Sequence, residues 1–223
     1  MGRPELQPRR GRRDASNNAS AATSAFTIVD PALTVTAPNT AVSWGLGSTQ
    51  AVTWTSNLGS SATVRIELSR NGGSTWTSLA ASAPNTGSFA WTVSGATTTT
   101  ARVRVTWTSG TGVSDTSDAN FTIAAAGVTV TVPNTRVTWT VGSVRTISWS
   151  HNLGTSATMR IEVSRNGGST WSVIAASAPN SGIATGSFNW TVTGPASTQA
   201  RIRVSWSTNT AVNDRSDVNF VIQ

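Results

Sequence analysis

The sequence predicts an all-β fold in which two similar sandwich domains follow a short basic arm. Three observations support this prediction: apolar and polar residues alternate with a period of two, turn-forming residues separate short runs, and one stretch of residues occurs twice. No convincing helical period is present. We therefore expect an arm at residues 1–30, a first repeat at 31–126 and a second repeat at 127–223.

The repeat is clearest at the octapeptide SRNGGSTW, which occupies Ser69–Trp76 and Ser164–Trp171. LTVTAPNTAVSW likewise corresponds to VTVTVPNTRVTW, at the same offset of 95 residues. A four-residue insertion near Ser181–Ala184 then raises the offset to 99. The tryptophans pair throughout, as Trp44, Trp54, Trp76, Trp91 and Trp107 with Trp139, Trp149, Trp171, Trp190 and Trp206. The second domain is therefore a copy of the first.

The arm contains a piece of the same pattern. SAFTIVDPALTV matches DANFTIAAAGVTV, and Phe26 stands 95 residues before Phe121. We therefore expect residues 20–28 to correspond to the last strand of a preceding repeat.

Each predicted strand is an alternating run bounded by turn residues. In the run Ala62–Ser69, Val64, Ile66 and Leu68 share one face, while Arg65 and Glu67 take the other. The runs Ser88–Val93 and Ala101–Thr108 alternate in the same way, with Asn-Gly-Gly and Pro-Asn-Thr-Gly turns between them. About seven or eight short strands in each repeat are typical of an immunoglobulin-like β-sandwich.

The repeated pattern V-T-x-P-N…W…VRIELSRNGGSTW…GSFxWTV…ARIRV…SDxSDxNFTI resembles repeats of bacterial extracellular proteins, which are similar to the Ser/Thr-rich domain of the yeast Kre9/Knh1 cell-wall family. The resemblance covers nearly all of residues 31–223 and implies tandem β-sandwich modules on cell surfaces or secreted enzymes. SRNGGSTW also resembles the Asp-box of sialidase propellers, S-x-D-x-G-x-T-W. Because Asn71 and Asn166 replace its aspartate, we expect a structural hairpin there.

Composition narrows the possible chemistry. The chain has no cysteine, so disulfides, thiolate zinc sites and cysteine nucleophiles are excluded. All 16 basic residues are arginine, and the net charge is +7. Five of these arginines lie in the arm: Arg3, Arg9, Arg10, Arg12 and Arg13. We expect no signal peptide, because no apolar segment follows the arginines.

Apart from Trp76 and Trp171, which end the octapeptides, the tryptophans divide into two groups. Trp54, Trp91, Trp107 and their counterparts lie on the apolar faces of predicted strands, so we expect them in the cores. Trp44 and Trp139 lie on short strands near the entrance of each sandwich. These two rings are therefore our candidates for glycan contacts, since an exposed indole can stack on a sugar.

The charged residues of the strands allow two interpretations. The outward-facing set is expected to form a cross-strand ladder of opposite charges, and an anion-binding face is the alternative. The set comprises Arg65, Glu67, Arg102, Arg104, Arg160, Glu162, Arg201 and Arg203. Two aspartates precede the last strand of each repeat, and we expect them to cap turns. They are also weak candidates for calcium ligands. These residues are Asp115, Asp118, Asp214 and Asp217.

No catalytic constellation is predicted. His151 is the only histidine, and Ser56 replaces it in the first copy. No Ser-His-Asp set or phosphate loop can be assembled from the spacing. We expect a protein that is not an enzyme and needs no cofactor or metal.

The arm is the strongest functional signal. Its five arginines, with Phe26 and Ile28, are predicted to anchor the sandwiches to other protein subunits, in an assembly or a homo-oligomer. Nucleic-acid binding through the arginines is a weaker hypothesis. We therefore expect a structural or display protein on the outside of a virion, filament or cell, with a carbohydrate-binding adhesion module as the alternative.

Overall fold

The computed structural model describes residues 28–110 and 112–223. The predicted arm, apart from its last three residues, lies outside the described residues. The strands of the first sandwich are β1 (Leu33–Ala37), β2 (Ser43–Gly45), β3 (Thr49–Ser56), β4 (Thr63–Ser69), β5 (Thr77–Pro84), β6 (Ser88–Thr92), β7 (Thr98–Trp107), β8 (Ser114–Thr116) and β9 (Phe121–Ala124).

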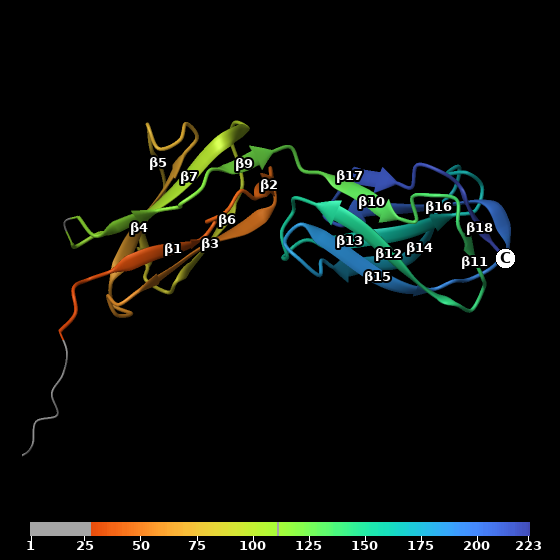
Figure 1. Cartoon of the computed structure of the whole chain (residues 1–223), viewed down its shortest axis with the longest axis horizontal. Helices are drawn as coiled ribbons and strands as arrows, with labels where there is room; N and C mark the ends of the chain where they lie inside the picture. The colour runs from red at the N-terminus through yellow and green to blue at the C-terminus, as the bar shows by residue number, and fades with distance from the viewer. Residues whose placement is uncertain (1–27, 111) are drawn as a thin grey trace, which may run out of the picture. The chain divides into compact units, whose positions relative to one another are not determined.

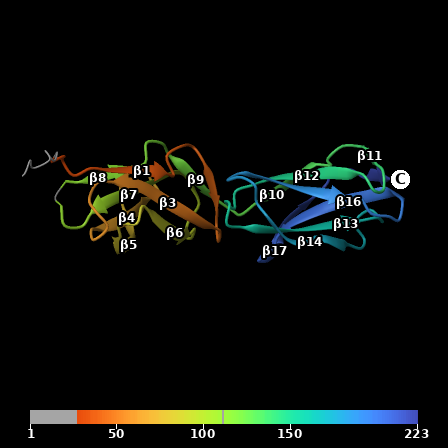
Figure 2. The ribbon, with the colours of Figure 1, turned by 90° about the horizontal axis from the view of Figure 1, so that it is seen from below.

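The second sandwich repeats this order. Its strands are β10 (Val128–Val132), β11 (Thr138–Trp139), β12 (Val144–His151), β13 (Thr158–Ser164), β14 (Ser172–Pro179), β15 (Thr185–Thr191), β16 (Ser197–Trp206), β17 (Asn209–Arg215) and β18 (Phe220–Ile222). Figures 1 and 2 show that each sandwich is built from one continuous stretch of chain, with no strand exchanged. The described residues contain no helix with the length and hydropathy needed to cross a bilayer.

The strand order defines an immunoglobulin-like fold. In the first sandwich one sheet has the order β1-β3-β6, and the other has β2-β9-β7-β4-β5 with β8 added beside β7. The second sandwich has the corresponding orders β10-β12-β15 and β11-β18-β16-β13-β14, with β17 beside β16. Two mainly antiparallel sheets packed face to face form the immunoglobulin-type sandwich. The predicted fold class, all-β with two tandem immunoglobulin-like sandwiches, is confirmed.

The first strand of each repeat is divided between the two sheets. β1 pairs with β3, whereas β2, which follows Pro38, pairs in parallel with β9. Proline donates no backbone hydrogen bond, so strand pairing is interrupted there. Together with the additional strand β8, this division gives more strands per repeat than the sequence predicts.

Burial follows the alternating pattern in the first half of β4, whereas Glu67, Leu68 and Ser69 at its end are all buried. In β4, Val64 and Ile66 are fully buried while Arg65 is exposed. Each sandwich has its own cluster of buried apolar residues, and the two clusters share no residue. Each sandwich therefore has a complete hydrophobic core.

One tryptophan lies at the centre of each core. Trp54 on β3 is 3% exposed and Trp149 on β12 is 1% exposed. The buried indole N–H of Trp54 donates to Asn85 Oδ1 at 2.7 Å, and that of Trp149 donates to Asn180 Oδ1 at 3.0 Å. The asparagine of each Pro-Asn turn thus satisfies a donor that would otherwise be costly to bury.

The Trp149 site predicts a strong effect of one methyl group. A Cβ at Gly186 would lie 2.2 Å from Trp149 Cε2, inside the van der Waals contact distance. Gly186→Ala should therefore lower the free energy of unfolding by about 1–3 kcal/mol, because the buried ring has to move. Urea denaturation measures the change. Gly127→Ala is the control, since nothing lies within 4 Å of its added Cβ, and equal stabilities of the two variants would contradict the prediction.

Candidate functional site

The duplicated octapeptide forms a hydrogen-bonded turn between β4 and β5. Ser69 is buried, and its Oγ accepts the N–H of Gly73 at 2.8 Å. Asn71 Oδ1 accepts the N–H of Thr75 at 2.9 Å. Gly72 and Gly73 have φ values of 69° and 97°, which favour glycine. The serine and asparagine side chains at these two positions therefore serve the turn itself, while Arg70 donates to the carbonyls of Ser94 and Ala96.

The second copy repeats these bonds closely. Ser164 Oγ accepts the N–H of Gly168 at 2.8 Å, and Asn166 Oδ1 accepts the N–H of Thr170 at 2.8 Å. Side chains used identically in both copies indicate a folding motif, because a catalytic group needs a free functional atom near its substrate.

The outer face of the β4–β7 pair carries a compact charge cluster. Glu67 lies opposite Arg104 in the strand register, and its Oε2 accepts from Arg104 Nη2 at 2.8 Å and from Nε at 2.9 Å. Arg65 Nε lies 3.4 Å from the same carboxylate oxygen. Arg104 also stacks over Trp76, with its Cζ 4.3 Å from the ring centroid. The two arginines thereby balance the negative charge of Glu67, whose side chain is mostly buried.

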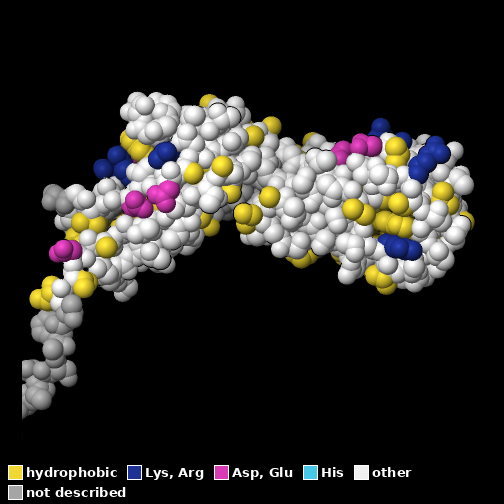
Figure 3. Space-filling view, in the orientation of Figure 1, with side chains coloured by type: hydrophobic (Ala, Val, Ile, Leu, Met, Phe, Trp, Pro, Cys, Tyr) yellow, Lys and Arg dark blue, Asp and Glu magenta, His cyan; other side chains and the backbone are white. Residues whose placement is uncertain are grey.

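The second sandwich has the same cluster. Arg203 Nη2 lies 2.7 Å from Glu162 Oε2, and Arg160 Nη2 lies 3.0 Å from Glu162 Oε1. Arg203 stacks over Trp171 at 4.4 Å. Arg102 and Arg201, the remaining members of the predicted ladder, instead donate to Asn120 and Asn219. Figure 3 shows charged side chains in small groups among a surface of mainly uncharged polar atoms and backbone.

Both pairs of aspartates hold backbone or amide groups across the sandwich. Asp115 Oδ2 accepts the N–H of the buried Val35 at 2.7 Å, and Asp118 Oδ2 accepts from Asn39 Nδ2 at 2.6 Å. In the second sandwich Asp214 accepts from Val130 at 2.8 Å and Asp217 from Asn134 at 2.7 Å. The calcium alternative gains no support, because each carboxylate is directed to a protein donor. Across the part of the chain that the structure describes, no group of three or more His, Cys, Asp or Glu could hold a metal ion.

The expected glycan contacts are corrected by the structure. Trp44 is 7% exposed and Trp139 is 5% exposed. Trp44 packs on Phe121 and Trp91 with ring centroids 4.8 and 6.1 Å apart, and Trp139 packs in the same way on Phe220 and Trp190. The short strands that carry them pair with β9 and β18, whose Phe121 and Phe220 pack on the rings, so neither indole offers a face to a sugar.

The indoles with more exposure are those that end the octapeptides. Trp76 and Trp171 are only partly buried, and each has an arginine over one face. The octapeptide pattern predicts only a structural hairpin at these residues. The alternation of Arg102, Arg104 and Thr106 on the outer face of β7 is the signal that could have placed an arginine above them.

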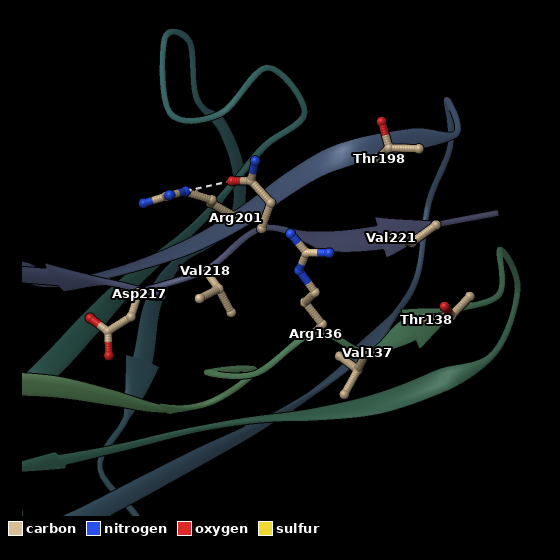
Figure 4. Close-up of a pocket in the computed structure, with 9 residues that line it drawn as sticks. Arg136, Val137, Thr138, Thr198, Arg201, Asp217, Val218 and Val221 are labelled. Carbon is tan, nitrogen blue, oxygen red and sulfur yellow. Dashed lines mark hydrogen bonds between the residues drawn. The ribbon is translucent and has the colours of Figure 1, made fainter.

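The second sandwich has a polar groove of about 560 Å³ beside β11, β16 and β18. Figure 4 shows Arg136 and Arg201 among the residues that line it, together with Asp217, Thr138 and Thr198. Arg201 is held by Asn219 Oδ1 at 2.6 Å and by the carbonyl of Ser216 at 3.3 Å. Arg102 makes the same bonds in the first sandwich. Arg136, which stands where the first repeat has Ala41, is the new basic residue of this groove.

His151 is buried at the end of β12 without a catalytic neighbour. Its Nδ1 accepts the N–H of Leu153 at 3.2 Å, and its Nε2 has no hydrogen-bond partner of normal geometry among the described residues. Burial lowers the pKa of His151 below its ordinary value of 6.5, and nearby backbone groups of Thr185 and Gly182 offset this only in part. The neutral ring is thus the form that the fold accommodates.

The anchoring residues Arg3, Arg9, Arg10, Arg12, Arg13 and Phe26 lie outside the described residues. Ile28, which is described, has 84% of its surface exposed. Its counterpart in the first sandwich, Ile123, is 1% exposed. Ile28 is therefore an apolar residue without the packing that its position has elsewhere in the repeat.

Known structures similar to this chain are tandem immunoglobulin-like or fibronectin-like domains. The fibronectin(III)-like modules of Clostridium thermocellum CbhA match at 13% identity over 85% of this chain and 92% of that chain, with a TM-score of 0.29. The teleost fish polymeric Ig receptor ectodomain matches at 10% identity over 86% and 98%, with a TM-score of 0.34. A chimeric titin Z1Z2 matches at 15% identity over 88% and 99%, with a TM-score of 0.35. No protein-family model matches the sequence, and no curated protein matches it significantly.

The class of protein therefore follows from the chain's own strand order, since the identities and TM-scores of these matches are low. The chain is a tandem immunoglobulin-like module with two sandwiches of the same repeat type.

The aspartate bonds predict unequal costs for two neighbouring carboxylates. Asp115→Ala should lower the free energy of unfolding by about 1–3 kcal/mol, because the buried N–H of Val35 loses its acceptor. Asp118→Ala is the matched control and should cost less, since its bond to Asn39 is exposed to water. Urea denaturation followed by tryptophan fluorescence measures both changes. If Asp118→Ala lowers the free energy of unfolding more than Asp115→Ala does, the assignment of a stabilising role to the Asp115–Val35 bond is wrong.

His151 predicts a pH dependence with a defined sign. Because the pKa of His151 is lowered by folding, the unfolded chain binds this proton at a higher pH than the folded chain does. The stabilisation is fully present above 6.5, the ordinary pKa, and is lost as pH falls from there toward the lowered pKa. Unfolding free energies at several pH values test this. His151→Ser, which copies Ser56 of the first repeat, should flatten the dependence in this window, and an identical slope would refute the assignment.

Proposed function

We propose that the chain is a non-catalytic structural protein whose two sandwiches are displayed from a larger assembly through its N-terminal arm. The observation that carries this proposal is the duplicated use of polar side chains as structural bonds. In both sandwiches the serine and asparagine of the octapeptide, the strand glutamate and the aspartates before the last strand have the same partners.

The arm supplies the attachment in this proposal. Its five arginines give a dense positive charge that favours an acidic protein surface. Residues 20–28 match the sequence of a last strand, and a detached strand can add to the edge of another sheet. The partner is accordingly another protein subunit, and we include a second copy of this chain as the simplest case.

The proposed location is the outside of a virion, filament or cell. The resemblance of the repeats to bacterial extracellular modules and to the Kre9/Knh1 cell-wall domain supports this location. The carbohydrate-binding alternative loses its proposed residues, because Trp44 and Trp139 are buried.

The arm can be tested by deletion. Sedimentation velocity of the full chain should show self-associated species, while a variant lacking residues 1–30 should sediment as a monomer. Circular dichroism and the unfolding midpoint should stay unchanged, because the core of each sandwich lies entirely within residues 33–222.

Two further variants separate the contributions of charge and strand. Replacing the five arginines by serine removes the charge and keeps the sequence of residues 20–28. Replacing Phe26 and Ile28 by serine does the reverse. Association that survives removal of the whole arm would refute the proposal. Association lost only with the arginines, and restored by added nucleic acid in a salt-dependent way, would instead support the nucleic-acid hypothesis.

A further inference from the structure

The two repeats carry different numbers of arginines on the same framework. The second repeat has seven arginines and three acidic residues, and the first has four arginines and three acidic residues. The acidic residues stand at equivalent positions in the two copies. The two copies therefore differ in positive charge alone. The added arginines are Arg136, Arg145 and Arg215, which stand where the first repeat has Ala41, Gln50 and Thr116.

One added arginine stands directly opposite another. Arg215 on β17 pairs with Arg203 on β16 in the strand register. In the first sandwich the equivalent Arg104 pairs with Thr116. Residues that are opposite in an antiparallel pair share a face, and like charges at such positions are destabilising. The second sandwich thus carries a repulsive pair that the first sandwich lacks.

Arg215 also reaches the turn of the second octapeptide. A Cβ added at Gly168 would lie 3.3 Å from Arg215 Nη1 and 3.5 Å from Trp171 Cζ2. Arg203 stacks on the same indole, with its Cζ 4.4 Å from the ring centroid. An added Cβ at the equivalent Gly73 meets no described arginine within 4 Å. Two guanidinium groups therefore gather at this turn.

The arginines continue into two polar grooves along β16. The groove of about 560 Å³ contains Arg136 and Arg201 (Figure 4). A second groove, of about 400 Å³, contains Arg160 and Arg203. Because Arg201 and Arg203 are alternate residues of one strand, they face the same side of the sheet, and the grooves are neighbours. We call this line the arginine track, and it consists of Arg136, Arg160, Arg201, Arg203 and Arg215.

The positive charge of the track is only partly balanced. Its two carboxylates are Glu162, which holds Arg160 and Arg203, and Asp217, which accepts from Asn134. Arg136 and Arg215 are exposed, and their guanidinium groups make no hydrogen bond or ion pair within the described residues. Five cations therefore face two anions, and two of the cations are free to bind a ligand.

The form and lining of the track indicate the ligand. A line of cations along a strand suits a chain with repeated anionic groups better than one small ion. Arginine recognises oxyanions through paired hydrogen bonds, and hydroxyl side chains can bond to sugar hydroxyls. No aromatic residue lines either groove, so bases would have no stacking platform there. The hydroxyl groups of the two grooves belong to Thr138, Thr198, Ser205, Ser207 and Thr210.

We propose that the arginine track of the second sandwich binds an acidic polysaccharide, whose sulfate or carboxylate groups pair with Arg136, Arg201 and Arg215. The repulsion between Arg203 and Arg215 is relieved when an anion lies between them. This inference goes beyond the proposed display function, since it uses a face of the second sandwich and no residue of the arm.

The test uses the full-length chain with the five arm arginines replaced by serine, so that the arm contributes no charge to binding. Isothermal titration calorimetry at low salt measures binding of dextran sulfate, of polygalacturonate and of uncharged dextran. Binding of at least one acidic polymer, and none of dextran, is expected. The tighter of the two identifies the anionic group, and added salt should weaken its binding.

Variants that copy the first repeat separate the track from general charge. Arg136→Ala and Arg215→Thr should each weaken binding about fivefold, and about 25-fold together, as is typical for exposed arginines facing an anionic surface. Arg145→Gln is the matched control, because it removes the same charge from β12 in the other sheet. It should change the affinity by less than about twofold. Arg215→Thr should keep or raise the unfolding midpoint, since a repulsive pair is removed.

Four results would overturn the proposal. Neither acidic polymer binds, or Arg145→Gln weakens binding as much as Arg215→Thr does. Arg215→Thr lowers the unfolding midpoint, which would make this arginine a structural residue. A DNA duplex or polyglutamate binds more tightly than both acidic polysaccharides at equal concentration of charge, which would assign the track to a different partner. Deletion of the arm tests the proposed display function separately, so either proposal can fail without the other.

Discussion

In each sandwich, the hydrogen bond of a buried indole links the hydrophobic core to a turn at one end of the sandwich. Trp149 fills the centre of the second core, and its N–H is satisfied by Asn180. The same asparagine donates through Nδ2 to the carbonyl of Gly154 at 2.9 Å. In the first sandwich Asn85 joins Trp54 to the carbonyl of Gly59 at 3.0 Å. A buried ring thus fixes, through one side chain, the turn that follows the strand carrying it.

Without cysteine, each sandwich needs another means of holding its sheets in register. Long-range polar bonds provide it, since Asp115 reaches Val35 across 80 residues and Asp214 reaches Val130 across 84 residues. The aspartate also occupies a backbone donor on β1, which lies at the edge of its sheet. An edge strand with occupied donors is a poorer template for unwanted pairing. The same bond therefore contributes to stability and removes one free donor from this edge.

The sequence predicts the strands well because alternation and burial are the same physical pattern. It also predicts most of the duplicated core, since three tryptophans of each copy are buried at equivalent positions. These are Trp44, Trp54 and Trp91 with Trp139, Trp149 and Trp190, whereas Trp107 is half-buried and its counterpart Trp206 is buried. The exposure of Trp44 and Trp139 could not be predicted in this way. Their burial comes from parallel pairing of β2 with β9 and of β11 with β18, contacts between segments about 80 residues apart in each repeat. Likewise, the sequence predicts only a turn-capping role for the aspartates, because their hydrogen-bond partners on β1 and β10 are distant in the chain.

A comparison of the two copies is more informative than either copy alone. Asn152 accepts the N–H of Gly127 through Oδ1, as Asn57 accepts that of Ala32, and the carbonyl of Asn152 also receives the N–H of Gly45. A Cβ at Gly45 would lie 2.5 Å from Asn152 Oδ1, and the second sandwich has Thr140 at the position of Gly45. Such differences between the copies therefore mark contacts that belong to one sandwich alone, and identities mark the bonds that fold both.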